Sequence, residues 1–264
     1  MSPSDSRAPL ALITGASGGI GEALAWCHAR AGGDLLLVAR SADKLARLQQ
    51  ALQQTCGVRV WILPLDLSQP TAAAQLADHC RQQSLTVDYL INNAGVGGHG
   101  LFHEQDPARQ EAMLQLNLMT LTRLTRLLLP AMVARGHGRI LNVASTAAFL
   151  PGPWQAVYFA SKAYVCSLSQ ALAAELAPCG ITVTALCPGA VATGFVAAGD
   201  LQGVDFWRGA PGAESVARCG YAAMLAGKLV AFNDWRLRLL IDGLLPWLPR
   251  RWVLTIAYRL MQKQ

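Results

Sequence analysis

Three polar side chains in the second half of the chain are spaced so that together they could move a proton. Tyr158 and Lys162 lie four residues apart in a segment with helical spacing, so their side chains share one helix face. A tyrosine has an ordinary pKa of about 10, and lowering it by about three would require about 4 kcal/mol, which a neighbouring ammonium can supply by stabilising the phenolate. Ser145 follows an expected strand and can donate a hydrogen bond to a substrate oxygen. These residues predict general acid–base chemistry.

A glycine-rich turn directly follows the first expected strand, with the sequence TGASGGIG at residues 14–21. Glycines at a strand-to-helix turn let the backbone approach a pyrophosphate, whose charge is met by the N–H groups of the helix N-terminus. A glycine cluster alone is common in tight turns. Its position in the first βα turn of a βαβ unit is that of a dinucleotide site.

The end of the second expected strand favours one nicotinamide cofactor over the other. An acidic residue at this point would bind the ribose 2′-hydroxyl of NAD, whereas an arginine accommodates a 2′-phosphate. The strand ends in Ala39, Arg40 and Ser41 and has no acid at its tip. Arg40 can form charge-assisted bonds to phosphate and Ser41 can add a hydroxyl donor. This favours NADP(H) over NAD(H), while the alternative is that Arg40 is a solvated charge at a strand end.

Short apolar runs alternate with longer segments of helical spacing from residue 10 onward. Such runs indicate strands that are buried on both faces. The alternation predicts an α/β fold, a single doubly wound Rossmann-type domain with a parallel sheet of about seven strands and helices on both faces. The expected strands are residues 10–14, 34–39, 58–63, 87–92, 139–144 and 181–186, and the expected helices are residues 21–31, 41–55, 71–82, 107–135, 158–177 and 213–226.

Two unequal parts are expected along the chain. Residues 8–230 form the Rossmann-type catalytic domain, and residues 231–264 form a basic, tryptophan-rich, helical C-terminal extension. Within the domain, residues 189–212 contain six glycines and read as a long loop, of the kind that often closes over a site.

Composition excludes several classes of protein. The chain has 264 residues, of which 53% are hydrophobic and 14% charged, so it can offset its ordering entropy by burial and is not disordered as a whole. The mean hydropathy of +0.30 raises the question of membrane spans. The longest uncharged stretches, residues 140–161 and 180–199, contain proline, glycine and hydroxyl residues, and neither is an unbroken apolar run of about 20 residues. A parallel sheet buried on both faces explains the same hydropathy.

Cysteine usage and the N-terminus indicate a cytoplasmic protein. The seven cysteines form no C-x-x-C pair and read as small buried hydrophobic residues of a reducing compartment. The N-terminus has an acid and no apolar run before Pro9, which is unlike a signal peptide. His99 and His103 are the one close pair of histidines, with only Glu104 nearby, and we expect no metal site there.

Positive charge is concentrated in the C-terminal extension. Residues 228–264 contain seven basic and two acidic residues, a net of +5, which leaves +1 of the chain's +6 for residues 1–227. A basic surface over the whole chain would have suggested nucleic acid, and a basic tail does not. Residues 244–254 mix tryptophan, leucine and arginine as interfacial segments do. The extension therefore docks on a membrane surface, covers the substrate opening, or packs on its own domain or a neighbouring subunit.

Taken in order, these motifs resemble those of the short-chain dehydrogenase/reductase family, of its single-domain type, over about residues 8–230. Each motif alone is weak, and their occurrence together at the expected intervals makes chance an unattractive explanation. They are TGxxxGxG at residues 14–21, Asp66, NNAG at residues 92–95, Asn117, Ser145, Tyr158-x-x-x-Lys162, and Pro188-Gly189 followed by Thr193.

The resemblance implies a role for each matching residue in catalysis. Tyr158 would be the acid/base, and Lys162 would hold the nicotinamide ribose and lower the pKa of the tyrosine. Ser145 would orient the carbonyl or alcohol, and Asn117 would hold a water that relays protons from Lys162. The reaction implied is hydride transfer between the nicotinamide and a carbon, while Tyr158 passes a proton to or from the oxygen.

It also implies which residues hold the cofactor. Position 18 is glycine, where some NADP-dependent members resembling this chain have a basic residue, so the 2′-phosphate would depend mainly on Arg40. Asp66 with Leu67 would contact the adenine, and Thr193 the carboxamide. The full expected set is Gly15, Ser17, Gly19, Ile20, Gly21, Arg40, Ser41, Asp66, Leu67, Asn93, Ala94, Gly95, Tyr158, Lys162, Pro188, Gly189, Val191 and Thr193.

Aromatic residues after the strand ends and in the 189–212 loop indicate an apolar substrate, a small hydrophobic ketone or aldehyde and its alcohol. Family members resembling this chain are often homodimers or homotetramers paired through two long helices, here residues 107–135 and 158–177. The alternatives are a non-catalytic NADP(H)-binding redox sensor, against which the complete catalytic set argues, and a membrane-associated scaffold. The aromatic residues are Phe102, Phe149, Trp154, Phe195, Phe206 and Trp207.

Overall fold

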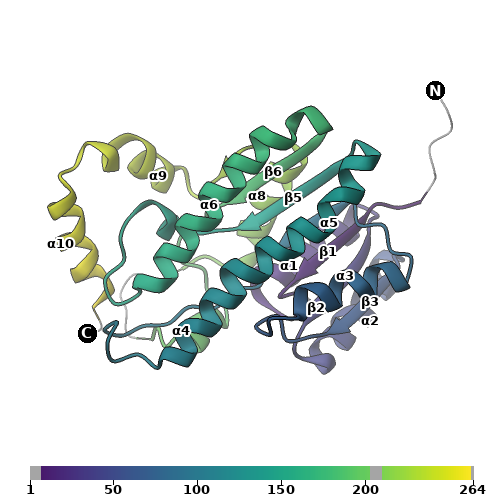
Figure 1. Ribbon diagram of the computed structural model, residues 1–264, viewed down its shortest axis with the longest axis horizontal. Coiled ribbons are helices and arrows are strands. Elements are labelled where there is room, and N and C mark those ends of the chain that lie inside the picture. Colours follow the sequence, from purple (N-terminus) through teal and green to yellow (C-terminus); the bar gives the residue numbers. More distant parts are fainter. Residues whose placement is uncertain (1–6, 203–209, 263–264) are drawn as a thin grey trace.

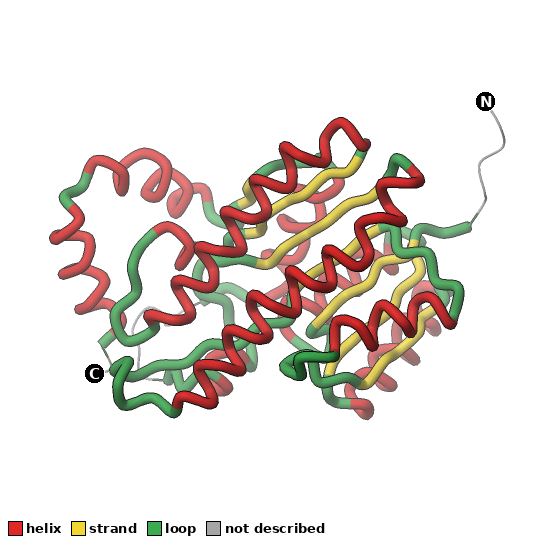
Figure 2. The backbone as a smooth tube through the Cα atoms, in the orientation of Figure 1, coloured by secondary structure: helices red, strands yellow, loops and turns green. Residues whose placement is uncertain are grey.

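The computed structural model describes residues 7–202 and 210–262, and its centre is one parallel sheet with strand order β3-β2-β1-β4-β5-β6-β7 (Figures 1 and 2). This order reverses direction between β1 and β4, which makes their carboxyl ends the switch point where doubly wound sheets bind ligands. The strands are β1 (Leu10–Thr14), β2 (Asp34–Ala39), β3 (Val60–Pro64), β4 (Tyr89–Asn92), β5 (Gly138–Val143), β6 (Ile181–Leu186) and β7 (Val230–Ala231).

Helices cover both faces of the sheet because its central strands are apolar on both sides. Ala11 and Ile13 of β1 pack in one core with α1, α2 and α8, while Leu10 and Leu12 pack in the other with α3, α5 and the end of α6. The predicted fold class is confirmed. The helices are α1 (Gly19–Arg30), α2 (Ala42–Cys56), α3 (Ala72–Gln82), α4 (Pro107–Leu114), α5 (Leu121–Arg135), α6 (Ala156–Leu176), α7 (Phe195–Ala198), α8 (Ala213–Leu225), α9 (Trp235–Arg238) and α10 (Arg250–Met261).

The predicted elements differ from the structure mainly at their ends. The strands expected to begin at residues 58 and 87 begin two residues later, at Val60 and Tyr89. The segment expected as one helix over residues 107–135 is α4 and α5 joined by the π-helical turn η1 (Gln115–Thr120). The 189–212 loop contains the short helix α7, and Phe206 and Trp207 lie outside the described residues.

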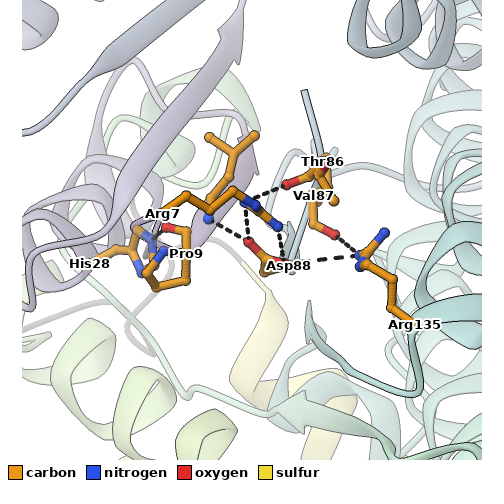
Figure 3. Close-up of polar contacts among 8 residues, drawn as sticks. Arg7, Pro9, His28, Thr86, Val87, Asp88 and Arg135 are labelled. Atoms are coloured by element: carbon orange, nitrogen blue, oxygen red, sulfur yellow. Dashed lines mark hydrogen bonds and ion pairs between the residues drawn. The ribbon is translucent and has the colours of Figure 1, made fainter. Parts of the chain in front are cut away.

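Two buried carboxylates stabilise what we call the amino-terminal edge of the sheet, the side on which its parallel strands begin. Asp88 accepts two hydrogen bonds of 2.9 Å from the Arg7 guanidinium and one of 2.8 Å from the backbone N–H of Leu10 (Figure 3). Asp34 accepts three from Arg59, one from its backbone N–H and two from its side chain, at 2.6–3.0 Å. Each carboxylate joins segments distant in sequence at the starts of the strands.

A buried histidine lies on the same side of the molecule. His28 is fully buried in α1, and its two ring nitrogens lie 3.0 Å from the carbonyl oxygen of Pro9 and 2.9 Å from the hydroxyl of Tyr221 (Figure 3 shows the first contact). Burial lowers the pKa of His28, so the neutral imidazole is the favoured form.

The chain ends in a helical segment, residues 235–261, which we name the C-terminal arm. It comprises α9, the turns η5 (Leu239–Leu244) and η6 (Leu245–Trp247), and α10. Figure 1 shows it in yellow, arching away from the sheet on the side opposite the N-terminus. Within the described residues, none of the helices has the length and apolar character required to cross a bilayer.

Candidate active site

The glycine-rich turn forms a close-packed cradle between β1 and α1. Gly15 has φ of +67°, and a Cβ there would lie 2.9 Å from Ala94 Cα. A Cβ on Gly21 would lie 2.3 Å from the carbonyl oxygen of Gly15. Only glycine fits either position, because one needs a left-handed backbone and both need the missing side chain. The cradle opens at Gly19, where α1 begins, and its free N–H groups suit a pyrophosphate.

Hydrogen bonds tie this turn to the end of β4. The hydroxyl of Thr14 accepts from the backbone N–H groups of Asn93 and Ala94, both at 3.0 Å. The amide of Asn93 donates to the carbonyl oxygens of Thr14 and Gly15 at 2.9 and 3.1 Å. The strand ends at the switch point are therefore joined by hydrogen bonds between neutral groups.

The expected acid–base residues lie together beside the cradle. Tyr158 and Lys162 come from the first half of α6, and the Lys162 ammonium lies 5.7 Å from the centre of the Tyr158 ring. The ammonium donates to the carbonyl oxygen of Val143, at the end of β5, at 2.8 Å. Ser145 lies beside the Tyr158 side chain and acts on its pKa. The Ser145 hydroxyl donates to the carbonyl oxygen of Pro188 at 3.4 Å, and its Oγ accepts from the N–H of Ala147 at 3.1 Å. The groups that sequence spacing brought together are brought together in space.

Burial dominates the titration of both groups. Desolvation raises the pKa of Tyr158 to about 12, an effect that the hydrogen bond from Ser145 opposes. Desolvation also lowers the pKa of Lys162 to about 8. The expectation that the ammonium lowers the pKa of the phenol is not met among the chain's own groups. The physical reason is that the two side chains share a dry environment, in which each charged form costs more than in water.

Asn117 lies in the π-helical turn η1, a distortion that is frequent at functional sites. Its side chain accepts from the N–H of Val96 at 3.0 Å and donates to the carbonyl oxygen of Val96 at 2.9 Å and to Ser161 Oγ at 3.1 Å. Asn117 therefore fixes the backbone that follows β4. A Cβ on Gly95 would lie 3.3 Å from Asn117 Oδ1 and 3.4 Å from Lys162 Nζ, so this segment passes close to the catalytic lysine.

A cavity of about 440 Å³ joins the cradle to the acid–base residues. Its size is within the range of small-molecule and cofactor sites. Because the cradle, the helix N-terminus and the cavity are continuous, the residues present fit a dinucleotide. The predicted residues that line it are Gly15, Ser17, Gly19, Ile20, Arg40, Asn93, Ala94, Gly95, Ser145, Tyr158, Lys162, Pro188, Gly189, Val191 and Thr193.

Five other predicted residues, Gly21, Ser41, Asp66, Leu67 and Asn117, lie outside the cavity lining. Gly21 packs behind the cradle and Ser41 precedes α2. Asp66 accepts from the N–H and hydroxyl of Ser68, and these bonds, with the attraction of Arg40, hold its pKa below the ordinary value. Leu67 is buried in the core. Their roles toward a cofactor stay predictions.

The cavity also contains residues that sequence reasoning missed. Lys44 lines the cavity together with Arg40. Its position in the sequence could have indicated this, because Lys44 follows Arg40 by four residues and lies in the first turn of α2. Phe195 of α7, already singled out as an aromatic residue, lies 5.4 Å from Tyr158 between ring centres. The other unforeseen lining residues are Gly18, Val96, Val143, Ala144, Gly194 and Ala198.

The C-terminal arm contacts the residues around Tyr158. Met261, the last residue of α10, is buried with Tyr158 and Phe159 in one apolar cluster. Its carbonyl oxygen lies 2.7 Å from His99 Nε2, and its sulfur accepts from the Gln155 amide at 3.3 Å. No local pattern links residue 261 to residue 158, so this contact was beyond sequence reasoning.

Comparisons with known proteins identify the family of this chain. Residues 9–201 match the family model for short chain dehydrogenase. Nodulation protein G of Rhizobium sp. (strain N33) is 39% identical over 179 residues, which cover 68% of this chain and 71% of that protein.

Two solved structures share the fold over most of the chain. A short-chain dehydrogenase from Sphingobium yanoikuyae in complex with NADPH has a TM-score of 0.82 and 33% identity, and covers 97% of this chain and 98% of its own. A short-chain dehydrogenase/reductase from Burkholderia phymatum in complex with NAD has a TM-score of 0.80 and 26% identity, and covers 89% and 92%. Such proteins act as nicotinamide-dependent oxidoreductases, and the chain described here belongs to the short-chain dehydrogenase/reductase family.

Proposed function

We propose that this enzyme is an NADP(H)-dependent carbonyl reductase or alcohol dehydrogenase that interconverts a hydrophobic ketone or aldehyde with its alcohol. The observation that carries the proposal is the position of Ser145, Tyr158 and Lys162 on the wall of the cavity that begins at the glycine cradle. A group held on the cradle and extending along this wall would bring its far end to the tyrosine hydroxyl.

Two basic side chains support NADP(H) as the cofactor. Arg40 and Lys44 both line the cavity near the end of β2, where the ribose of a bound dinucleotide belongs in this fold. Two cations there suit a phosphate dianion better than a neutral ribose hydroxyl. Asp66 attracts Arg40 but is itself engaged with Ser68, which leaves the guanidinium donors available to a ligand.

Apolar lining supports a hydrophobic substrate. Val96 and Phe195 line the cavity and pack against the apolar cluster of Tyr158, which also contains Met261. The basic side chains of the cavity other than Lys162 are at its cofactor end. Among the described lining residues, Lys162 is the one cation beside Tyr158, so a small dianionic substrate would not find a pair of basic side chains there.

The proposed chemistry uses the chain's own groups for the proton. A bound nicotinamide supplies or accepts the hydride. In the reducing direction the Tyr158 hydroxyl donates its proton to the substrate oxygen, and Ser145 donates a hydrogen bond that holds this oxygen in place. The high pKa of the buried tyrosine keeps its hydroxyl protonated until negative charge develops on the substrate oxygen and the proton is transferred to it. Lys162, with its pKa lowered to about 8, is poised to return a proton near neutral pH.

Apolar side chains exposed on α5 and α6 support a homodimer or homotetramer built through these helices. Leu127 and Val133 of α5 and Tyr164 of α6 are each more than a third exposed. Side chains of this kind commonly mark a subunit contact when they lie close together. The redox-sensor alternative is not favoured, because a sensor would not need Asn117, Ser145, Tyr158 and Lys162 together.

The decisive experiment is a screen for NADPH oxidation across apolar ketones, aldehydes and acyl-chain carbonyl compounds. We expect turnover with some members of this panel, and the Tyr158→Phe enzyme serves as the blank. Equal rates with both enzymes would contradict the assignment of Tyr158.

The cofactor preference has its own test. We expect Arg40→Ala and Lys44→Ala each to weaken the binding of NADPH about tenfold or more, because a charge-assisted bond to the phosphate is lost. The affinity for NADH should change little. Arg47→Ala is the matched control, since Arg47 is exposed on the same helix and does not line the cavity. Equal weakening of both cofactors would overturn the preference for NADP(H).

A further inference from the structure

The last helix of the C-terminal arm carries three parallel stripes of side chains. Residues spaced by four in a helix lie above one another, so each stripe runs along α10. The first stripe is inward and buried, the second is apolar and exposed, and the third is polar and exposed. The stripes are, in that order, Val253, Ala257 and Met261; Trp252, Ile256 and Leu260; and Arg251, Thr255 and Arg259.

The inward stripe fixes how the arm lies on the catalytic domain. Met261 packs in the cluster of Tyr158, and its backbone carbonyl is bonded to His99. Further contacts come from the rings of Tyr258 and Trp154, whose centres are 5.5 Å apart. At the other end of the arm, a Cβ on Gly189 would lie 2.6 Å from Leu237. The arm is therefore held at both ends by the cavity side of the domain, and its outward face has a defined direction.

The outward face is far more apolar than a solvated surface needs. Trp247 is 85% exposed, Trp235 is 67% exposed and Trp252 is 65% exposed. Many exposed large apolar side chains within one segment of 27 residues are typical of an interaction site. Tryptophan at high exposure is typical of segments that lie at a membrane–water interface, where its ring is buried among headgroups while its N–H stays hydrated. The other exposed apolar residues of the arm are Leu239, Leu240, Leu244, Leu254, Ile256, Tyr258 and Leu260.

Charge on the arm indicates the partner's chemistry. Residues 235–261 contain five arginines and one acid, a net of +4. Asp242 is paired with Arg238, at 3.4 Å. The guanidinium of Arg236 lies 5.6 Å from the centre of the Trp235 ring, an arrangement that keeps a cation next to an apolar group. Arginine beside tryptophan suits a surface that is negatively charged outside and apolar beneath.

We propose that the C-terminal arm docks on the surface of an anionic lipid bilayer. The tryptophans enter the headgroup layer and the arginines contact lipid phosphates. The arm lies on the membrane and does not cross it, because α10 has 12 residues and about 18 Å of length against a hydrocarbon core of about 30 Å. Since Met261, at the end of the inward stripe, packs in the Tyr158 cluster, a docked arm holds the catalytic domain against the lipid.

A second copy of this chain fits the surface less well. A symmetric pair places the same patch of each subunit against the other, so two arms of net +4 would meet. Residues 1–227 carry a net charge of only +1 and offer no overall acidic counterpart. An anionic bilayer satisfies both the charge and the apolar area at once.

The test is cosedimentation of the full chain with phosphatidylcholine vesicles and with vesicles that also contain phosphatidylglycerol. The wild-type chain should bind the anionic vesicles and not the neutral ones, with affinity that falls as salt rises. Arg250→Gln with Arg251→Gln should weaken binding about thirty-fold, from the loss of two cations at the surface. Trp247→Ala with Trp252→Ala should weaken it at least about tenfold. All four residues are exposed, so the variants should keep the wild-type melting temperature.

Arg47→Gln with Arg218→Gln is the matched control, because both arginines are exposed outside the arm and the net charge falls by the same amount. This control should bind as the wild type does. Failure of the wild type to sediment with anionic vesicles would overturn the proposal, and so would equal loss in the control, which would indicate general charge attraction. If the tryptophan variant binds vesicles normally but has a smaller oligomeric mass, the surface is a subunit contact. The readout needs no turnover, so it is independent of the proposed reaction.

Discussion

The two edges of the sheet are built from opposite kinds of chemistry. At the amino-terminal edge, buried carboxylates are matched by guanidinium groups, as in the Asp88–Arg7 and Asp34–Arg59 pairs. At the carboxyl edge, glycines and amides surround a tyrosine and a lysine that are both desolvated. One edge joins distant segments by paired charges, whereas the other places a lysine and a tyrosine on the wall of a cavity, bonded to neutral groups of the chain. The residues that stabilise the fold and the residues proposed for catalysis therefore lie at opposite ends of the same strands.

The largest effect we expect is from Tyr158→Phe. This change removes the proton donor and should lower kcat about a thousand-fold, which corresponds to about 4 kcal/mol of transition-state stabilisation. The free energy of unfolding should change little, because the phenyl ring keeps its packing with Phe159 and Phe195. Steady-state kinetics and urea denaturation of the two enzymes measure both quantities. A decrease of about 4 kcal/mol in the free energy of unfolding as well would contradict the assignment of Tyr158 to catalysis and not to stability.

The mirror-image change is Asp88→Ala, with a somewhat smaller expected effect. It leaves the Arg7 guanidinium without its carboxylate and the Leu10 N–H without its acceptor. We expect a loss of about 3 kcal/mol in the free energy of unfolding, because the hydrogen bonds from a charged guanidinium are lost and the N–H of Leu10 is left without an acceptor. The kcat of the folded enzyme should stay within about twofold of the wild type, since Asp88 is at the edge away from the cavity. A selective loss of kcat would contradict the separation of roles.

Sequence reasoning succeeds where one local pattern determines the result. Strand β1 is recognisable because five buried residues in a row leave no helical periodicity, and the glycine cradle because its spacing is fixed by a single turn. The clamps of the amino-terminal edge have no such pattern, since Arg7 and Asp88 are separated by 81 residues. Met261 and Gln155, 106 residues apart, are a similar case at the active site.

The electrostatics of the site were harder still. A tyrosine and a lysine four residues apart predicted a stabilised phenolate, but the burial of both groups decides the pKa values. Burial depends on how α6 packs against the ends of β5 and β6, which a single helix pattern does not contain. The spacing therefore identified the right residues, and the sign of the shift needed the tertiary structure.

An intermediate effect on the free energy of unfolding is expected from Lys162→Met, which should raise it, whereas Asp88→Ala lowers it. Burial lowers the pKa of Lys162 from 10.5 to about 8, so the charged form costs the folded state about 3 kcal/mol below pH 8. Losing the bond to the Val143 carbonyl oxygen costs about 1 kcal/mol in return. We therefore expect the variant to be inactive but about 2 kcal/mol more stable than the wild type at pH 7, measured by urea denaturation.

The pH dependence of the same pair is a second measurement of this prediction. Between pH 8 and about 10 the unfolded chain binds more protons at Lys162 than the folded chain does, so wild-type stability should rise with pH. Above pH 10 the raised pKa of Tyr158 acts in the opposite direction, because the folded chain then binds more protons at that residue. The Lys162→Met variant should lack the rise between pH 8 and 10. A wild-type profile parallel to that of the variant would show that the lysine is not desolvated.

The smallest effect belongs to His28, the titratable group near the amino-terminal edge. Burial lowers its pKa, so the unfolded chain takes up a proton before the folded chain does as the pH falls. Stability from this group is complete above its ordinary pKa of about 6.5 and is lost at lower pH. His28→Phe should cost about 1 kcal/mol at pH 7, from the bonds to Pro9 and Tyr221, and should flatten the fall in stability between pH 7 and 5. Because the kcat profile should keep its shape, urea denaturation and kinetics across this range separate a structural histidine from a catalytic one.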